Sequence, residues 1–188
     1  MSEKTEITVI TLTKDNHNEL YESLFSIYSQ DINCFIEILV IDGSQNIKYS
    51  IKLIDQIKKV FNSKTKNLNY VNSYEKGIRG IYPSMNHGLD NVRSDYLIFM
   101  NSGDSFYDKF SLRNLFKEIK RTNSVICFGQ SLILSKNISW LSPSPFVKNI
   151  KLWCKFFEPI HQSMLVKTSI GRTLCFDINS PIGADSKW

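Results

Sequence analysis

Apolar residues fall into two alternating patterns along the first two thirds of this chain. Short runs of apolar residues are typical of strands, and an almost uninterrupted run is typical of a strand covered on both faces. Phe35 to Ile41 is the clearest example. We expect strands at residues 7–12, 35–41, 68–71, 95–100 and 125–128.

Between these runs, apolar residues recur every three or four positions, which is the period of an amphipathic helix. The most regular stripe consists of Ile47, Ile51, Ile54, Ile57 and Phe61, with lysines on the opposite side. The sequence predicts helices at 20–28, 47–61, 81–89 and 110–119, and Pro83 fits the first turn of the third. Strands that alternate with helices predict an α/β fold with a mostly parallel central sheet and helices on both faces.

The pattern loosens after Phe128. Ser142 to Pro145 predict a turn or linker, residues 147–157 have helical spacing, and residues 162–166 predict one more strand. A chain of 188 residues is in the size range of one domain with one core. We therefore interpret residues 1–188 as a single domain.

Composition and charge narrow the class of protein only a little. Hydrophobic residues make up 42% and charged residues 22%, and the net charge of +5 could favour a phosphate-bearing ligand or an anionic membrane surface. The N-terminus lacks a signal-peptide core and no run of about 18 apolar residues occurs, so we expect a cytoplasmic protein. The four cysteines form no C-x-x-C pair, which favours small buried hydrophobes over a zinc site or disulfides.

Acidic residues follow two of the predicted strands, in turns that contain glycine. Asp42 lies in the segment Val-Ile-Asp-Gly-Ser, and Asp104 lies in Asn-Ser-Gly-Asp-Ser. Residues 80–88, Gly-Ile-Tyr-Pro-Ser-Met-Asn-His-Gly, lie between them. Ligands of open α/β sheets bind beyond the carboxyl ends of the strands, so we expect a binding site at these turns.

This order of segments resembles family 2 glycosyltransferases, which have the A-type, Rossmann-like nucleotide-sugar fold. The bacterial branch that builds capsule, lipopolysaccharide O-chain and exopolysaccharide usually reads G-I-Y-D-A-M-N-K-G in the middle segment and N-S/A-G-D in the last. The resemblance extends from Thr8 to Asp185. It implies a metal-dependent, inverting hexosyltransferase that moves a sugar from a nucleotide-sugar, with uridine as the family's usual base, to a hydroxyl of a glycan or lipid-linked glycan. Residues 1–105 would form the donor half and residues 106–188 the acceptor half.

The resemblance assigns the nucleoside to Asp42, with Thr11 or Thr13 lining the same pocket, and a Mg²⁺ or Mn²⁺ ion to Asp104. Many relatives carry an Asp-x-Asp pair where this chain has Asp104 alone. One carboxylate is workable, because the diphosphate and waters can fill the remaining coordination sites. From the residues alone, Asp42 can equally begin an Asp-Gly turn, and Asp104 can cap a helix or a turn.

Three more residues are candidates for contacts with the donor or acceptor. Arg79 could reach phosphate oxygens, and Asn86 lies on a helix that borders the donor site in relatives. His161, in a segment that resembles the family's P-H-Q segment, could contact the diphosphate or the acceptor. Ordinary packing is the alternative for each. Pro83 and His87 replace the common Asp and Lys of the branch, which leaves the donor-sugar contacts open.

Inverting transfer needs a base near the acceptor hydroxyl, opposite the leaving diphosphate. Relatives supply it from a segment that reads roughly A-D-Y-D, and residues 183–186, Gly-Ala-Asp-Ser, are the best match. Asp185 is therefore the predicted base, and a solvated tail residue is the alternative. Relatives continue for dozens of residues beyond the position of Trp188, which indicates an acceptor half that is truncated at its C-terminus.

Two other functions stay open from the sequence. A truncated, catalytically weak nucleotide-sugar binding module would keep only the donor pocket. A nucleotidyltransferase or dinucleotide-binding protein is disfavoured, because no G-x-G-x-x-G follows the first strand and no G-x-x-x-x-G-K-S/T loop occurs. We expect a nucleotide-sugar and a glycan or polyprenyl-diphosphate-linked acceptor as partners, and no nucleic acid.

The segment 147–157 mixes lysines with aromatic and aliphatic residues. At helical spacing Val147, Ile150, Cys154 and Phe157 fall on one side and three lysines gather on another. A basic amphipathic helix of this kind can lie in a membrane interface, which would give a peripheral contact with the inner face of the cell membrane. The alternative is that the apolar side packs on the sheet.

Overall fold

A six-stranded sheet in the order β3-β2-β1-β4-β8-β5 forms the centre of the computed structural model, which describes residues 5–155, 157 and 159–179. Strands β1 to β4 are parallel, and β8 is antiparallel to both of its neighbours, β4 and β5. The strands are β1 (Ile7–Thr13), β2 (Ile36–Asp42), β3 (Lys66–Asn72), β4 (Tyr96–Phe99), β5 (Ile126–Phe128) and β8 (Met164–Lys167). The predicted α/β fold with a mostly parallel sheet is confirmed.

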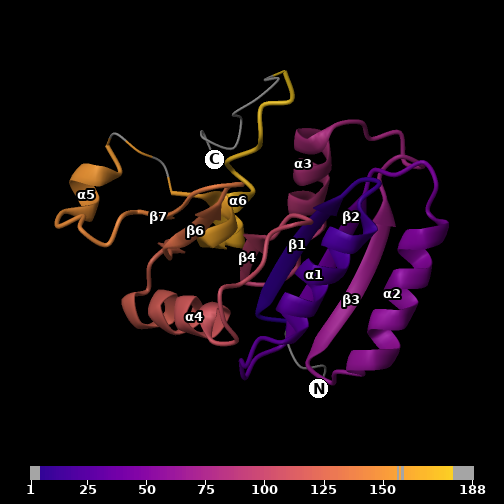
Figure 1. The fold of residues 1–188 in the computed structure, drawn as a ribbon, viewed down its shortest axis with the longest axis horizontal. Helices are drawn as coiled ribbons and strands as arrows, with labels where there is room; N and C mark the ends of the chain where they lie inside the picture. Colours follow the sequence, from indigo (N-terminus) through magenta and orange to yellow (C-terminus); the bar gives the residue numbers. More distant parts are fainter. Residues whose placement is uncertain (1–4, 156, 158, 180–188) are drawn as a thin grey trace.

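Helices cover both faces of this sheet (Figure 1). One face packs against α1 (His17–Tyr28), α2 (Lys48–Phe61) and α4 (Ser111–Thr122), and the other packs against α3 (Ile81–Asn91). Alternating residues of each strand face the two layers, so that Ile7 and Val9 enter the first core while Ile10 and Leu12 enter the second. This alternation explains why apolar residues occur on both faces of the central strands.

The first helix begins where its sequence offers a cap. The side chain of Asn16 accepts a hydrogen bond from the backbone N–H of Glu19, which satisfies one of the free donors of the first turn. Leu20, Leu24 and Ile27 are fully buried against the sheet. The cap therefore sets the start of α1 beside the end of β1, and it places Glu19 at the edge of the sheet that carries the site.

Helix α3 approaches the sheet closely because Gly88 has no side chain. A β-carbon at this position would lie 2.9 Å from Ile10 Cγ2 and 3.0 Å from Ile41 Cδ1, which is closer than side chains pack. The helix begins after Gly80, whose φ of 98° is in the range that favours glycine, and Pro83 lies in its first turn as predicted. These two glycines fix where α3 lies beside the site.

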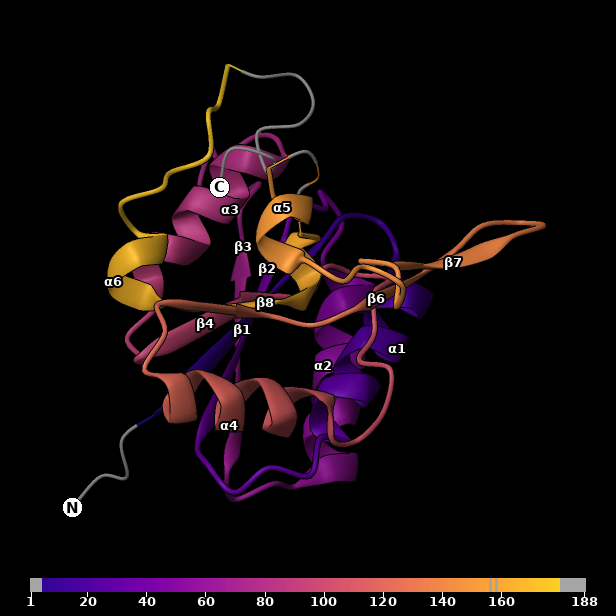
Figure 2. The same cartoon turned by 90° about the vertical axis from the view of Figure 1, so that its left-hand side faces the viewer.

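The segment between β5 and β8 leaves the sheet and forms a separate hairpin (Figure 2). Its two antiparallel strands are β6 (Ser131–Leu134) and β7 (Ser139–Ser142), which the sequence did not predict. Three short helices follow the hairpin: α5 (Ile150–Trp153), η1 (His161–Ser163) and α6 (Thr168–Gly171). None of the helices in the part of the chain that the structure describes is long and apolar enough to cross a bilayer.

The prediction of one helix over residues 147–157 was wrong. Among the described residues of this segment, only those of α5 are helical. The side chain of Asn149 caps α5 by accepting from Leu152 N, and a turn that closes at Ser144 precedes it. The alternative, in which the apolar side packs on the sheet, is also not what the structure has. Ile150 is 42% exposed and Phe157 is 60% exposed. Trp153 makes the ring contact that links this segment to the sheet, with its ring centroid 6.5 Å from that of Phe128.

Candidate functional site

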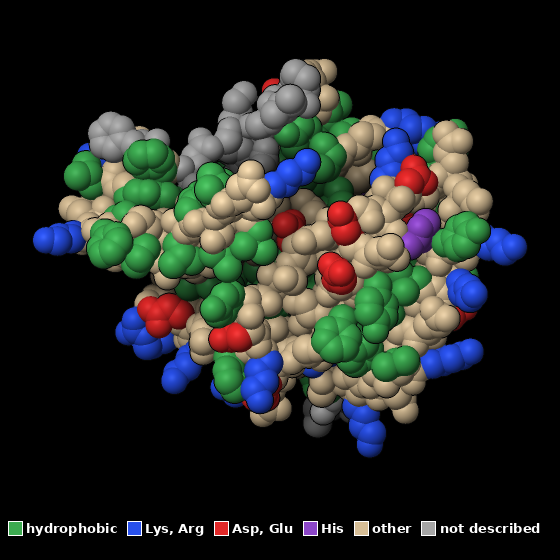
Figure 3. Space-filling model, in the orientation of Figure 1, with side chains coloured by type: hydrophobic (Ala, Val, Ile, Leu, Met, Phe, Trp, Pro, Cys, Tyr) green, Lys and Arg blue, Asp and Glu red, His purple; other side chains and the backbone are tan. Residues whose placement is uncertain are grey.

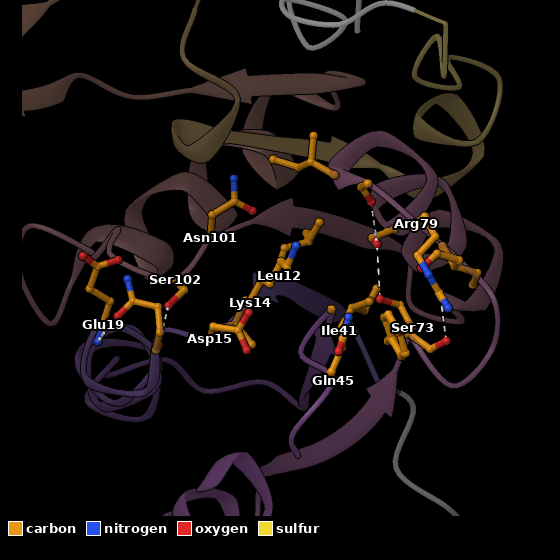
Figure 4. A pocket seen from close by; sticks show the side chains of 18 of the residues that line it. Leu12, Lys14, Asp15, Glu19, Ile41, Gln45, Ser73, Arg79, Asn101 and Ser102 are labelled. Atoms are coloured by element: carbon orange, nitrogen blue, oxygen red, sulfur yellow. Dashed lines mark hydrogen bonds between the residues drawn. The ribbon is translucent and has the colours of Figure 1, made fainter. Parts of the chain in front are cut away.

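A cavity of about 1100 Å³ opens at the carboxyl ends of the parallel strands, where the sequence places its glycine turns. Its walls come from the loops after β1, β2, β3 and β4 and from the start of α3. Figure 4 shows Ser73 and Arg79 on one side of the cavity and Glu19, Asn101 and Ser102 on the other, with Lys14 and Asp15 between them. One end is therefore basic and the other carries carboxylate and amide oxygens.

Asp42 lies beneath the cavity and accepts hydrogen bonds from residues of the strands and loops around it. Its carboxylate is buried, with 0% of the residue exposed, and Oδ1 accepts hydrogen bonds from the N–H and the hydroxyl of Ser44. Oδ2 accepts from the hydroxyl of Tyr70 over 2.9 Å, and this bond together with burial raises the pKa of Tyr70. The hydroxyl oxygen of Ser44 in turn accepts a hydrogen bond from the backbone N–H of Asp15 over 2.8 Å. Asp42 thus joins the loops after β1 and β2, and its side chain does not reach the cavity surface.

The basic side of the cavity is built around Arg79. Its guanidinium carbon lies 3.6 Å from the centroid of the Tyr74 ring, and its Nη1 donates to the carbonyl of Tyr74 over 2.6 Å. Ser73, next to Tyr74, is held by a hydrogen bond from its N–H to the carbonyl of Asp42. These contacts fix an exposed cation and an aromatic ring at the cavity wall. Such a wall suits an anionic ligand with a planar ring.

The opposite end of the cavity is formed by the loop after β4. Asp104 Oδ2 accepts a hydrogen bond from Gln162 Nε2 over 3.1 Å, and the hydroxyl of Ser23 donates to the Asp104 carbonyl over 2.7 Å. Burial raises the pKa of the Asp104 carboxyl, while the Gln162 hydrogen bond and the charge of His161 act in the opposite direction. The structure therefore brings Asp104 and His161, both predicted from the sequence, to one place. It adds Gln162, which follows His161 in the P-H-Q segment and was not predicted as a site residue.

The charge of Glu19 also acts on this end, because it raises the pKa of Asp104. Glu19 lines the cavity from the first turn of α1, and Asp15 lines it from the loop after β1. Acidic side chains gather near the middle of this face in Figure 3. No sequence motif marks Glu19; the helical spacing after the first strand indicates only that it lies near the start of a helix.

These oxygen atoms fit a hard divalent cation. The Oδ1 atom of Asn101 is buried and has no hydrogen-bond partner among the described residues, so an acceptor at the cavity wall is left unsatisfied. No group of three or more His, Cys, Asp or Glu side chains in the described ranges is arranged to hold a metal by itself. Mg²⁺ is commonly held by one or two carboxylates together with substrate phosphates, so the donors around Asp104 are sufficient for that kind of site.

The remaining candidates lie in different places. Thr13 lines the cavity, whereas Thr11 is 0% exposed in the core beneath it. Asn86 uses both ends of its amide on the backbone of Phe176: it donates to the carbonyl over 2.9 Å and accepts from the N–H over 2.8 Å. It therefore ties α3 to the C-terminal segment, which is the packing role that the sequence left open for this residue. Asp185 lies outside the described residues.

The family model for glycosyl transferase family 2 matches residues 8–176 of this chain. Among proteins with curated functions, none matches at a significant level. Solved structures with a similar fold include Staphylococcus aureus TarS, residues 1–349, with a TM-score of 0.63 at 15% identity. Another is the mannosyltransferase PcManGT from Pyrobaculum calidifontis in complex with GDP-Man and Mn²⁺, with a TM-score of 0.68 at 14% identity.

These alignments cover 97% and 99% of this chain but 53% and 51% of the two neighbours, so the chain spans about half of their length. TarS 1–349 has also been solved in complex with UDP-GlcNAc, and that structure aligns with a TM-score of 0.60 at 16% identity, over 92% of this chain and 49% of TarS. At such identities the similarity establishes the fold, which is that of the nucleotide-sugar transferases.

Proposed function

The chain belongs to glycosyl transferase family 2, and on that premise we propose that it transfers a sugar from a nucleotide-sugar donor to a hydroxyl group of an acceptor. The observation that carries the proposal is the cavity of about 1100 Å³ at the carboxyl ends of the strands. One of its ends has an arginine beside an aromatic ring, and the other has oxygen ligands. A nucleoside diphosphate has the matching chemistry, with a planar base and two charged phosphates.

The basic side of the cavity supports binding of the donor's nucleotide. Arg79 and Lys14 both line the cavity and carry positive charge that can offset the diphosphate. The neighbouring structures hold GDP-Man and UDP-GlcNAc, which supports a nucleotide-sugar without deciding the base. We take a UDP-sugar as the first donor to test.

We propose that Asp104 holds a Mg²⁺ or Mn²⁺ ion with the donor's diphosphate. Asp104 has one oxygen bound by Gln162, and its N–H donates to the carbonyl of Asn101 over 3.0 Å. The side-chain oxygen of Asn101 has no partner among the described residues, and the mannosyltransferase neighbour was crystallised with Mn²⁺. A bound divalent cation would neutralise the negative charge that develops on the leaving diphosphate. His161 lies close enough to Asp104 to influence its pKa, so it is placed to contact the diphosphate or the acceptor.

The proposed reaction inverts the anomeric centre. The acceptor oxygen forms a bond to the anomeric carbon, the bond from that carbon to the diphosphate oxygen breaks, and its electron pair leaves with the diphosphate. The hydroxyl proton passes to a carboxylate, for which the sequence offers Asp185. Asp42 acts in this scheme by positioning the loops that carry Asp15 and Ser44, rather than by touching the nucleoside.

We propose a glycan or lipid-linked glycan as the acceptor, in surface polysaccharide synthesis at the cytoplasmic face of the membrane. Support comes from an exposed apolar surface on the hairpin and the segment after it, which faces left in Figure 3. Nine large apolar side chains there are 38–88% exposed: Leu132, Leu134, Ile138, Trp140, Leu141, Phe146, Ile150, Leu152 and Phe157. Residues 119–157 contain six lysines and arginines and no aspartate or glutamate. Exposed apolar side chains interspersed with lysines suit an anionic lipid surface.

Thermal unfolding with nucleoside diphosphates and their sugar conjugates, with and without Mn²⁺, tests the donor site. A ligand at 100 times its Kd adds about 2.7 kcal/mol, which corresponds to roughly 5–10 °C for a domain of this size. Arg79→Ala should weaken binding about tenfold or more, because hydrogen bonds to charged groups contribute about 1.5–3 kcal/mol. Arg93→Ala is the matched control, since Arg93 is exposed and bonds only to nearby carbonyls among the described residues.

A second measurement separates an enzyme from a binding module. Release of the nucleoside diphosphate from the stabilising donor, in the presence of polyprenyl-diphosphate-linked glycans, reports transfer. Binding without turnover over a panel of acceptors would favour the binding module. If no nucleotide or nucleotide-sugar stabilises the protein, the donor site itself is wrongly assigned.

A further inference from the structure

The carboxylate of Glu19 lies where a side chain on Gly103 would project. A β-carbon built on Gly103 would be 2.9 Å from Glu19 Oε2 and 3.3 Å from its Cδ. Gly103 itself has a φ of 97°, which side-chain-bearing residues rarely adopt. The loop after β4 thus leaves a space beside Asp104 that a carboxylate from another element fills.

Two elements that are far apart in the sequence hold this arrangement together. The hydroxyl of Ser23, one turn after Glu19 on α1, accepts from Gly103 N over 3.0 Å and donates to the carbonyls of Asn101 and Asp104. Ser23 is fully buried. Helix α1 is therefore bonded directly to the loop that carries Asp104, and this contact fixes the position of Glu19 relative to that loop.

Among the described residues, no lysine or arginine pairs with the two carboxylates at this end of the cavity. Glu19 and Asp104 lie close enough for the charge of one to affect the other. Glu19 and Asn101 line the cavity, and the Asn101 side-chain oxygen is buried with no hydrogen-bond partner among the described residues. Asp104 follows Gly103 in the same loop, and its N–H donates to the Asn101 carbonyl over 3.0 Å. Carboxylate and amide oxygens of this kind are the donor chemistry of a hard divalent ion.

We propose that Glu19 is the second carboxylate of the divalent-cation site, supplied by α1 in place of an acidic residue in the loop after β4. This inference rests on the proposed function and goes beyond it, because it assigns a cation-binding role to a residue outside the motif that carries Asp104. The alternative is that Glu19 only stabilises the N-terminus of α1, as acidic residues in a first turn commonly do.

Binding of Mn²⁺, followed by electron paramagnetic resonance of the free ion, tests this role without relying on activity. Titrations are made on the full chain with Mn²⁺ alone and with Mn²⁺ plus UDP or GDP. Glu19→Gln keeps the size of the side chain and removes its charge. We expect it to weaken Mn²⁺ binding about tenfold or more, which is the usual cost of disturbing the shell around a metal.

Two variants make the result specific. Glu22→Gln changes the same kind of residue one turn later on α1, outside the cavity, and should bind Mn²⁺ as the wild type does. Asp104→Asn should lose most Mn²⁺ binding. Urea unfolding of Glu19→Gln should differ little from the wild type, because the residue is exposed.

The outcomes separate the inference from the proposed function. If Asp104→Asn loses Mn²⁺ binding and Glu19→Gln does not, Glu19 is not part of the site, and the proposed function stands. If the wild type binds no more Mn²⁺ than the nucleotide does in free solution, both the metal dependence and the role of Glu19 are overturned. If Glu19→Gln and Glu22→Gln lose the same Mn²⁺ affinity, the loss comes from the overall charge of α1 rather than from a ligand, and the assignment of Glu19 is refuted.

Discussion

Gln162 donates a hydrogen bond to Asp104 across 3.1 Å, and so joins the end of the hairpin excursion to the loop after β4. The two residues are 58 positions apart in the sequence. The bond favours the charged carboxylate, against the burial that raises the pKa of Asp104. Gln162 therefore favours an ionised Asp104, which is the state that the proposed cation site requires.

Replacing Gln162 with Ala should raise the pKa of Asp104 further. A raised pKa means that the carboxyl becomes protonated at a higher pH as the solution is acidified. We therefore expect Mn²⁺–nucleotide affinity to fall at a higher pH in Gln162→Ala than in the wild type, with little difference well above the pKa. Calorimetric titrations across pH 4–8 measure this shift, and superimposable pH profiles would show that Gln162 does not tune Asp104.

Substitution of Asp42 tests whether this residue positions the loops around the cavity or contacts the nucleoside. In Asp42→Asn the amide oxygen can still accept from Ser44, and the amide nitrogen can donate to the hydroxyl of Tyr70. We expect nucleoside-diphosphate affinity within a few-fold of the wild type. If the Asp42→Asn protein is stable but no longer binds nucleotide, Asp42 contacts the nucleoside directly, as the resemblance implies.

Asp42→Ala is the companion variant and should behave differently. It leaves the N–H of Ser44 and the hydroxyl of Tyr70 without their acceptor, and an unsatisfied buried group costs about 1–3 kcal/mol. Urea unfolding should show this loss of stability. Donor affinity should fall with it, because the Ser44 hydroxyl that accepts from Asp15 N loses the carboxylate that orients it.

Gly88→Ala should destabilise the fold by about 1–3 kcal/mol, since the added methyl group would meet Ile10 and Ile41 at about 3 Å and push α3 off the sheet. Gly129→Ala is the control: its added β-carbon would lie at an ordinary 3.7 Å from Leu115, and we expect a change within about 0.5 kcal/mol. Denaturant unfolding of both variants provides the comparison. Equal stability would mean that α3 is free to shift outward.

Asp185→Asn should leave donor binding unchanged and slow transfer by roughly two to four orders of magnitude, which is the usual contribution of a general base. Product formation with a saturating donor measures this, and the donor affinity is measured on the same preparation. Normal turnover in this variant would remove Asp185 from the mechanism.

Membrane contact predicts flotation with anionic vesicles and not with neutral ones. Replacing Lys148, Lys151 and Lys155 with Glu should remove about 3 kcal/mol of attraction, since a lysine near an anionic leaflet contributes about 1 kcal/mol. The same three changes at Lys58, Lys59 and Lys64, which are exposed on and after α2, form the matched control. If the wild type stays unbound to anionic vesicles at low salt, the apolar surface has another partner.

The periodic segments predicted the fold well because each has one dominant structural pattern. The strands and helices from Ile7 to Phe128 lie within a few residues of their expected positions. The prediction of one helix over residues 147–157 failed because the side chain of Asn149 starts a new, short helix within the apparent helical spacing. Few tertiary contacts hold this segment. The hairpin β6–β7 has an alternation too short and too exposed to be recognised.

The candidate site was predictable only where residues follow strands directly. Asp104 and Thr13 reach the cavity end of the sheet for that reason, and His161 lies beside Asp104. The direction of a side chain at a strand end was not predictable from the sequence. Asp42 and Thr11 are both fully buried, so neither lines the cavity as expected. Glu19 could not be found, because its proximity to Gly103 depends on how α1 packs beside β4.

Residues 129–163 leave the central sheet and return to it at one point. Phe128 and Met164 are directly paired between β5 and β8, and Gly129 N donates to the carbonyl of Ser163 over 3.0 Å. The excursion is thus closed at its base, so that changes within it place no strain on the strands whose ends form the cavity. Grafting residues 131–158 from a relative should therefore leave the affinity for the proposed nucleotide intact. The cavity and the region that we propose for the acceptor can then vary independently of each other.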